Sequence, residues 1–395
     1  MSAALRHPFR GRVAAVGIGE TPYYKRGSSP DAERKLCLKA IVAACEDAGI
    51  DPKDVDGFSS YGADENEGPR LTAGLGTREV RWSTLIWGGG GGGSAGALAA
   101  AASAIISGQA DTVVVYRASA ESSSGRLLNK VSDGYFGLNY VAHGLDSPAQ
   151  NLALYSQRQI EHDGVAPSAF RALALASYYH AQNNPRAVAY GKPLDERTYD
   201  ASRMIAEPYR LFDCSRENDA AAAVVLTSAE RAAHLTDRPA YLLGAAFGSG
   251  PRWGELDANH DPISSGGFRE VAARVWKQSG YGPGDVDVAQ VYLNFTGPGV
   301  AALIDHGFCT PEETAEKLVL ENLIAPRGWL PVNTSGGDLA EGFVHGMGNT
   351  LEAIRQIRGE SSNQVPGARL SLLTGGPMAE LVSSALFGSV DTLED

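Results

Sequence analysis

Residues 48–61 read AGIDPKDVDGFSSY, and residues 279–292 read SGYGPGDVDVAQVY. When the two stretches are aligned, they share Gly, Pro, Asp, Val, Asp and Tyr at the same spacing, and each follows a predicted helix of similar length. Such self-similarity indicates an internal duplication. The sequence therefore predicts two homologous halves, residues 1–237 and residues 238–395, packed as a pseudo-dimer.

Each half alternates predicted strands and helices. In the first half, RVAAVGIG (12–19) and DTVVVY (111–116) are strand-like, and residues 32–49 form an amphipathic helical pattern that ends at glycine. A glycine-rich segment, a helix, a glycine and a strand follow one another at 87–116 and again at 333–376. These patterns predict an α/β fold with helices covering largely parallel strands.

A long excursion interrupts the first half. Residues 117–150 are polar and aromatic without clear periodicity, which is typical of a loop over a site or an interface, and helices are expected from 151 to 183. The excursion is therefore placed at about 117–183. A strand, DAAAAVVLTS (219–228), completes this half.

Composition limits the class of protein. The chain has 395 residues, 43% of them hydrophobic and 20% charged, with a net charge of −12 and no cluster of Lys and Arg, so a nucleic-acid partner is not expected. No stretch of 18 apolar residues occurs, which argues against a membrane span. The four cysteines are scattered, which predicts a reducing, cytoplasmic location. They are Cys37, Cys45, Cys214 and Cys309.

The glycine run at 88–93 leads into a helix of small residues. Glycine loses more backbone freedom on folding than other residues, so such a run indicates a close backbone approach. No lysine follows it, which excludes a Walker phosphate loop. Residues 92–96 match G-x-S-x-G, the pattern of a hydrolase nucleophile elbow, and leave open a serine hydrolase that uses Ser94.

Three segments of the second half carry a family resemblance: VYLNFTGPG (291–299), NTSGGDLAEGFVHGMGN (333–349) and LLTGGPMAE (372–380). They resemble thiolase-fold proteins, and the resemblance covers nearly the whole chain. It implies two duplicated α/β halves in a five-layer α-β-α-β-α arrangement. It also implies that a loop after a second-half strand, a glycine-histidine loop and a C-terminal glycine loop surround one acyl-thioester.

The thiolase cysteines are missing. In thiolases, a nucleophilic cysteine stands at the start of the glycine-led helix, where its thiolate is stabilised. The matching position here falls near Gly91, and the C-terminal glycine loop has Thr374 in place of the second cysteine. Acyl transfer through a cysteinyl thioester is therefore excluded, whereas stabilisation of an enolate by backbone NH groups would survive.

Other phrases, including HGLDSPAQ (143–150) and IAEPYRLFDC (205–214), resemble the thiolase-like aldolases of the lipid-transfer-protein group, relatives of the sterol carrier protein x thiolases. That group shortens steroid side chains at the acyl-CoA level. The resemblance implies a carbon-carbon lyase that cleaves a branched β-hydroxyacyl-CoA to a ketone or aldehyde and a short acyl-CoA such as propionyl-CoA.

The resemblance also assigns roles. Two tyrosines are implicated in that group; the first falls on Tyr292, predicted to exchange the substrate hydroxyl proton, whereas the second falls on Phe343, which cannot move a proton. His345 is predicted to assist, and Asn294 to orient substrate. NH groups around Gly91 to Ser94, with the Gly375-Gly376 turn, are predicted to hold the thioester oxygen.

The resemblance implies a homodimer, and a small OB-fold partner with a zinc ribbon that completes a heterotetramer. The chain itself is expected to need no metal and no cofactor beyond CoA as part of the substrate. Alternatives stay open: a non-catalytic thiolase-like subunit, which would explain Phe343 and the absent cysteines together, the Ser94 hydrolase or acyltransferase, and a decarboxylating or Claisen-type enzyme. His345 and Tyr292 could also be structural. His143 and His180 could line an entrance, and Cys214 and Cys309 are expected to be buried packing residues.

Overall fold

The computed structural model describes residues 7–62, 64–87, 90–120, 140–251, 262–378 and 381–394. Within them, ten strands form one mixed sheet. In spatial order they are β10 (Val288–Gln290), β11 (Leu370–Gly375), β12 (Val382–Gly388), β9 (Ala240–Gly248), β1 (Val13–Glu20), β8 (Asn218–Ser228), β5 (Thr112–Ser119), β3 (Gly57–Tyr61) and β4 (Trp82–Ile86), and β2 (Tyr24–Lys25) pairs with β8.

The sheet consists of two half-sheets with the same pairing pattern. In the N-terminal half, β3 is parallel to β5, and β5, β8 and β1 then pair antiparallel. In the C-terminal half, β10 is parallel to β11, and β11, β12 and β9 then pair antiparallel. The half-sheets join through a short antiparallel ladder in which Ala14 faces Tyr241 and Ala15 faces Ala240.

The repeated sequence motif has the same structural role in both halves. Its Pro-x-Asp part forms a 3-10 turn, η1 (Pro52–Asp54) and η6 (Pro283–Asp285). Its second aspartate accepts a hydrogen bond from the first backbone amide of the neighbouring parallel strand. The Thr112 amide donates to Asp56 at 2.8 Å, and the Leu370 amide donates to Asp287 at 2.9 Å. The motif therefore sets the register between the strand that follows it and that strand's parallel neighbour.

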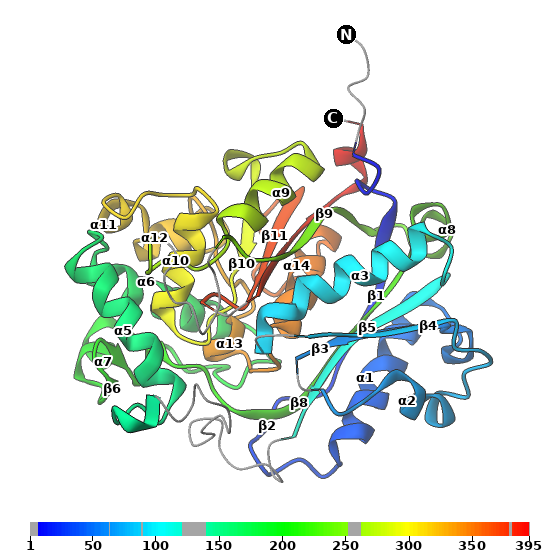
Figure 1. Ribbon diagram of the computed structural model, residues 1–395, viewed down its shortest axis with the longest axis horizontal. Coiled ribbons are helices and arrows are strands. Elements are labelled where there is room, and N and C mark those ends of the chain that lie inside the picture. The colour runs from blue at the N-terminus through cyan, green and yellow to red at the C-terminus, as the bar shows by residue number, and fades with distance from the viewer. Residues whose placement is uncertain are drawn as a thin grey trace.

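The helices form three layers around the two half-sheets (Figure 1). Helices α3 (Ser94–Ile106) and α14 (Met347–Arg358) lie in the middle, since each contacts strands of both halves. On the outside, α1 (Glu33–Ala48) covers β1, β8 and β5, and α9 (Arg269–Ser279) covers β9 and β12. This is the predicted α-β-α-β-α arrangement, although the two half-sheets also touch at β1 and β9.

The small residues of α3 are explained by its central position. A methyl group added at Gly96 would lie 2.9 Å from the ring of Phe247 on β9, and the helix residues Ala97, Leu98 and Ala101 are completely buried. A helix packed between two sheets has little room for side chains, so alanine and glycine allow the sheets to approach it closely.

Further helices and short strands cover one end of the sheet. The predicted helical stretch 151–183 is divided into α5 (Pro148–Glu161), which begins with a capping box at Ser147 and Gln150, and α6 (Pro167–Ala181). The residues 121–139 of the predicted excursion lie outside the described residues. The remaining elements are α2 (Gly68–Leu75), η2 (Gly90–Gly93), α7 (Glu196–Ala201), β6 (Met204–Ala206), β7 (Tyr209–Arg210), η5 (Leu211–Asp213), α8 (Ala229–Leu235), α10 (Thr296–Asp305), α11 (Thr314–Lys317), α12 (Leu320–Leu323), α13 (Gly337–Ala340) and η7 (Val390–Leu393).

Helix α6 connects the excursion with the second half. It packs against α10, α12 and α13, which all lie between β10 and β11 in the sequence. The loop after β10 and the glycine-histidine loop before α14 therefore meet the segment between η5 and β8. The predicted division at 237/238 falls between α8 and β9 and stays a prediction.

Candidate active site

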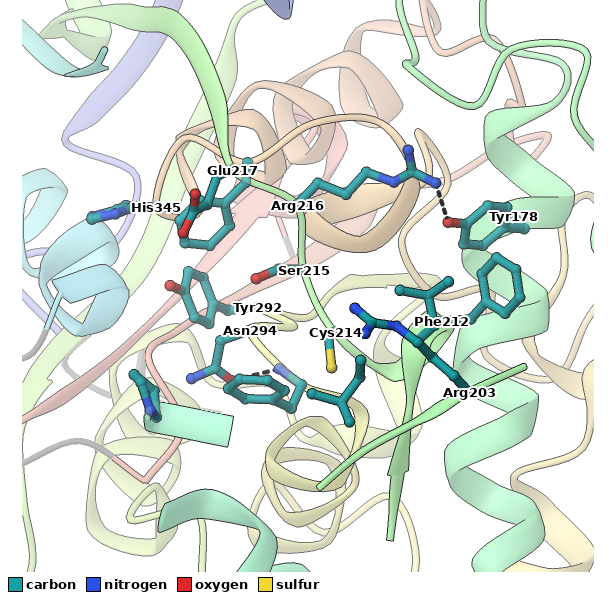
Figure 2. A pocket seen from close by; sticks show the side chains of 15 residues that line it. Tyr178, Arg203, Phe212, Cys214, Ser215, Arg216, Glu217, Tyr292, Asn294 and His345 are labelled. Carbon is teal, nitrogen blue, oxygen red and sulfur yellow. Dashed lines mark hydrogen bonds between the residues drawn. The ribbon is translucent and has the colours of Figure 1, made fainter. Parts of the chain in front are cut away.

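A cavity of about 530 Å³ lies where these segments meet (Figure 2). Four of the predicted site residues line it: Tyr292, Asn294, Phe343 and His345. The other lining residues come mainly from the excursion and from the segment that leads into β8. They are Pro148, Tyr178, Arg203, Ile205, Leu211, Phe212, Cys214, Ser215, Arg216, Glu217 and Phe295. Most of the wall is apolar, and the polar groups gather at its two ends.

Tyr292 follows β10, and its ring lies against the backbone of Gly91. A methyl group added at Gly91 would lie 2.2 Å from ring atom Cε2 of Tyr292 and 2.8 Å from its hydroxyl oxygen. The Gly91 amide hydrogen-bonds to that hydroxyl. A side chain at position 91 and the Tyr292 ring therefore exclude each other. The match of position 91 to the thiolase nucleophile stays a prediction.

The Tyr292 hydroxyl is a proton donor at neutral pH. Burial raises its pKa well above the ordinary value, and the negative charge of Asp338 raises it further, while Arg117 and the Gly91 amide lower it. Because desolvation dominates, the phenol stays protonated. Tyr292 can therefore give a proton to a developing carbanion, whereas it is poorly suited to take one from an alcohol.

His345 is held from two sides. Its backbone has a φ of +47°, and its carbonyl oxygen accepts a hydrogen bond of 2.8 Å from the Tyr61 hydroxyl. Its Nδ1 lies 3.2 Å from Nη2 of Arg117, which in turn pairs with Asp64 at 3.2 Å. A guanidinium can only donate, so Nδ1 must accept and the ring proton is on Nε2. His345 can therefore donate a hydrogen bond through Nε2.

Phe343 provides an apolar wall between the polar residues. Its ring centroid lies 6.1 Å from that of Tyr292 and 4.9 Å from that of His345. The backbone amide of Phe343 donates to Asn218 Oδ1 at 3.1 Å, which ties the glycine-histidine loop to the beginning of β8. The structure thus places Phe343 in the cavity, where its phenyl group offers no proton.

Asn294 presents its amide nitrogen to the cavity. Its Oδ1 accepts from the amide of Phe295 at 2.8 Å, and its backbone oxygen accepts from the amide of Ser215 at 2.9 Å. The first bond turns Nδ2 away from the backbone (Figure 2). Asn294 can therefore donate to a substrate oxygen.

The predicted contacts of Gly91, Ser94, Gly375 and Gly376 with the substrate stay a prediction. These residues cluster near the Tyr292 ring, and none of them lines the cavity described above. A methyl at Gly376 would lie 2.2 Å from the backbone of Gly92, and one at Gly375 2.2 Å from Ser94 Oγ. The glycine loops therefore pack against each other.

The hydrolase hypothesis for Ser94 is not supported. Ser94 begins α3, is completely buried, and its Oγ forms no hydrogen bond with any residue that the structure describes. A serine nucleophile needs a base within hydrogen-bond reach and access to substrate. Ser94 has neither.

The cysteines and remaining histidines behave as structural groups. Burial raises the pKa of Cys214 to about 12 and that of Cys309 to about 11, so neither is a thiolate at neutral pH. Cys214 does line the cavity, which the packing prediction did not anticipate. His180 is completely buried rather than at an entrance, and its Nε2 accepts from the amide of Ala325. His143 is exposed and does not line the cavity.

Sequence reasoning missed several functional candidates. Glu217, Arg216 and Arg203 line the cavity, and Asp338 lies behind it, where it accepts hydrogen bonds from the Leu293 amide and from Asn349. Asp338 thereby holds the loop after β10 against α14. The charged Ser-Arg-Glu-Asn run immediately before a wholly buried strand was the available signal, since charge at the edge of a core segment needs an explanation.

Neither a metal-ligand cluster nor a membrane-spanning helix is found among the residues that the structure describes. No group of three or more His, Cys, Asp or Glu side chains is arranged to hold a metal ion there. None of the helices described has the length and apolar character needed to cross a membrane.

The sequence of the chain is similar to those of several known proteins. The family profile described as Thiolase C-terminal domain-like matches residues 252–387. The 17-hydroxy-3-oxo-4-pregnene-20-carboxyl-CoA lyase of Mycobacterium tuberculosis is 37% identical over 93% of this chain and 96% of its own length. The steroid side-chain-cleaving aldolase of Thermomonospora curvata is 34% identical over 95% of this chain and 98% of its own length.

Solved structures show the same relationship. The structure named Ltp2-ChsH2(DUF35) aldolase has a TM-score of 0.89 at 33% identity, covering 96% of this chain and 98% of that one. An acetyl-CoA acetyltransferase from Syntrophomonas wolfei has a TM-score of 0.68 at 19% identity, covering 96% of this chain and 99% of that one, which supports the fold.

The duplicated sheet and the central helices therefore define a thiolase-fold protein. Within that fold, the chain belongs to the thiolase-like, steroid side-chain-cleaving aldolases, and it is a carbon-carbon lyase that lacks the thiolase cysteines. The predicted family, fold and class of activity are confirmed.

Proposed function

We propose that the protein cleaves a branched β-hydroxyacyl-CoA by a retro-aldol reaction, releasing a ketone or aldehyde and a shorter acyl-CoA such as propionyl-CoA. A steroid side chain is the proposed acyl group, because both of the relatives above are named for steroid substrates. The observation that carries the proposal is the position of Tyr292, which lines a largely apolar cavity and lies against the backbone of Gly91.

The cavity suits a bulky acyl group. Its volume falls in the range of ordinary ligand pockets, and Ile205, Leu211, Phe212, Phe295 and Phe343 form its apolar wall. These side chains leave few hydrogen-bonding groups, which favours a hydrocarbon framework over a polar substrate.

Two arginines at the other end suit the CoA part. Arg203 and Arg216 line the cavity, and among the described residues neither forms an ion pair with a carboxylate. Arg216 donates instead to the Tyr178 hydroxyl at 2.6 Å. Guanidinium groups bind phosphate oxygens well, so these residues are the proposed contacts of the CoA phosphates.

The thioester end is assigned to the polar residues around Tyr292. We propose that Asn294 Nδ2 and the Nε2–H of His345 donate to the thioester oxygen as the carbon-carbon bond breaks and negative charge moves onto it. Tyr292 then protonates the enolate carbon. This role is the reverse of the predicted one, in which Tyr292 takes the hydroxyl proton, because burial favours the protonated phenol.

We further propose a homodimer formed at the free edge of the sheet. Strand β4 ends the strand order, and Trp87 and Leu85 beside it are 83% and 43% exposed. An edge strand with exposed apolar side chains is suited to pairing with a second copy. The name of the similar Ltp2-ChsH2(DUF35) structure joins two proteins, which supports a partner protein. A small OB-fold and zinc-ribbon partner that completes a heterotetramer stays part of the proposal.

The proposed reaction moves protons and electron pairs without net oxidation or reduction, so it calls for CoA as part of the substrate and for no redox cofactor in this chain. The proposal includes no metal. A cytoplasmic location remains part of the proposal. It is supported by four cysteines that are all free thiols.

The test is direct cleavage of a synthetic substrate. The chain, alone and together with its candidate small partner, is incubated with a steroid β-hydroxyacyl-CoA, and the ketone and propionyl-CoA are quantified by mass spectrometry. The proposal expects stoichiometric release of both products. CoA binding without either product would instead favour a non-catalytic subunit, the second candidate, which Phe343 supports.

A further inference from the structure

A retro-aldol reaction needs a base as well as an acid. The base removes the proton of the β-hydroxyl group, so that the oxygen can form a carbonyl as the carbon-carbon bond breaks. None of the residues that were assigned a role in the proposed function is suited to this step. Phe343 has no proton acceptor, Tyr292 is kept protonated by burial, and Nδ1 of His345 is already engaged by Arg117.

Glu217 is the carboxylate that lines the cavity. It lies in the extended segment between η5 and β8, and Figure 2 shows its side chain on the same side of the cavity as Tyr292 and His345. Of the acidic residues described, it is the only one among those lining residues. A carboxylate in this place can reach a substrate whose thioester lies between Tyr292 and His345.

The segment that carries Glu217 is held firmly on both sides. Ser215, two residues earlier, donates its amide to the backbone oxygen of Asn294 at 2.9 Å. Asn218, the next residue, accepts the amide of Phe343 through its Oδ1 at 3.1 Å. The backbone at Glu217 is therefore tied to the same two loops that carry Asn294 and Phe343, which gives the carboxylate a defined position relative to Tyr292.

Glu217 has a charge partner beside the cavity. Nε of Arg26 lies 3.0 Å from Glu217 Oε2. A guanidinium attracts a carboxylate and orients it through its fixed N–H groups. The ion pair therefore helps to fix the position of the Glu217 carboxylate at the cavity wall.

We propose that Glu217 is the catalytic base that accepts the β-hydroxyl proton, in compensation for the phenylalanine at position 343. This inference rests on the proposed retro-aldol function. The protein then divides the two proton transfers between a carboxylate and a phenol.

The proposed step is balanced. The hydroxyl proton passes to Glu217, the oxygen electrons form the C=O bond of the ketone or aldehyde, and the electrons of the broken carbon-carbon bond pass to the thioester enolate. Tyr292 gives its proton to the enolate carbon and becomes a phenolate. Transfer of the proton from Glu217 to Tyr292, directly or through water, restores both groups.

The first test is Glu217→Gln, which keeps the size of the side chain and removes the base. We expect kcat to fall about 100-fold with KM changed less than about threefold, because general bases contribute rate enhancements of this order. Glu230→Gln on exposed α8 is the matched control and should retain the wild-type rate. Glu217→Asp keeps the carboxylate, and should retain activity above that of the Gln variant even if the Gln variant folds poorly.

The second test asks whether only the ion pair of Glu217 matters. Arg26→Gln tests the ion pair alone and should lower kcat much less than Glu217→Gln does.

The outcomes separate the two proposals. If the wild-type protein releases ketone and propionyl-CoA and Glu217→Gln does so at an unchanged rate, the inference about Glu217 is overturned while the proposed function stands. Equal losses in Arg26→Gln and Glu217→Gln would also overturn it, since they would show that only the ion pair matters. If the wild-type protein, with its partner present, releases neither product, the proposed function fails and the assignment of Glu217 fails with it.

Discussion

The two halves of the molecule end their repeated motif with a tyrosine, and the two tyrosines have become different. Tyr61 ends β3 and is completely buried, and its hydroxyl donates to the carbonyl oxygen of His345. Tyr292 follows β10 and lines the cavity, and its hydroxyl meets the Gly91 amide. One tyrosine supports the site from behind, and the other faces the substrate space.

A buried aspartate lies near each tyrosine, and the two aspartates have different partners. In the N-terminal half, Asp64 is paired with Arg117 at 3.2 Å. In the C-terminal half, Asp338 accepts hydrogen bonds only from neutral donors, and burial raises its pKa to about 6. Duplication thus supplied two equivalent frameworks, and the residues added around each one decided which became the scaffold and which became the site.

The sharpest way to break this comparison is Tyr292→Phe. Loss of the hydroxyl removes the proposed acid, so kcat should fall by about 10²–10⁴-fold with little change in stability. Steady-state kinetics and circular dichroism measure the two quantities. A variant that retained the wild-type rate would show that Tyr292, like Tyr61, is structural.

The aspartate behind Tyr292 should make stability depend on pH. Because its folded pKa, about 6, exceeds the ordinary value of 3.8, its contribution to folding is fully present below that value and is lost as pH rises through 6. The difference corresponds to about 3 kcal/mol. We expect urea unfolding of wild type and Asp338→Asn to diverge by this amount between pH 4 and pH 7, with wild type losing stability relative to the variant.

Another buried titratable group, in the N-terminal half, also makes stability depend on pH, but it does not disturb this comparison. His180 is buried and has a pKa lowered to about 4, so its contribution is lost as pH falls from 6.5 and has the opposite sign. It is present in both proteins and cancels in the difference between them. A difference that did not change with pH would contradict the assignment of Asp338.

The contact between Gly91 and Tyr292 can be tested by Gly91→Ala. The added methyl would overlap the ring, so we expect a loss of about 1–3 kcal/mol in unfolding free energy together with a lower kcat. The double variant Gly91→Ala/Tyr292→Ala should show almost no further loss relative to Tyr292→Ala, because the clash is then absent. An additive loss would mean that the methyl meets something other than Tyr292.

The smallest effect is expected for Tyr61→Phe. The variant loses one buried hydrogen bond to the backbone of His345, which costs about 1 kcal/mol of stability, and its kcat should change less than about threefold. Thermal unfolding and the cleavage assay measure the two effects. A loss of activity as large as that of Tyr292→Phe would show that the two tyrosines act together in catalysis.

Much of the fold could be predicted from the sequence by itself. The Pro-x-Asp-Val-Asp motif occurs twice because each copy sets a 3-10 turn and caps a neighbouring parallel strand, which are local interactions. The small residues after the glycine run predicted a helix in a crowded place, and the absence of cysteine at Gly91 and Thr374 excluded thiolase chemistry. The turns and the helix depend on residue type and spacing alone, whereas the exclusion of thiolase chemistry depends on the resemblance to thiolases.

The tertiary structure decided which residues face the cavity. Gly91, Ser94, Gly375 and Gly376 pack close to Tyr292, but they do not line the cavity that Tyr292 faces. Glu217 lies 75 residues before Tyr292 and escaped a search for family motifs, because only the folding of the segment before β8 against two distant loops brings it into the site. Local sequence sets the strands, helices and turns, whereas the direction of a side chain depends on long-range packing that no short pattern contains.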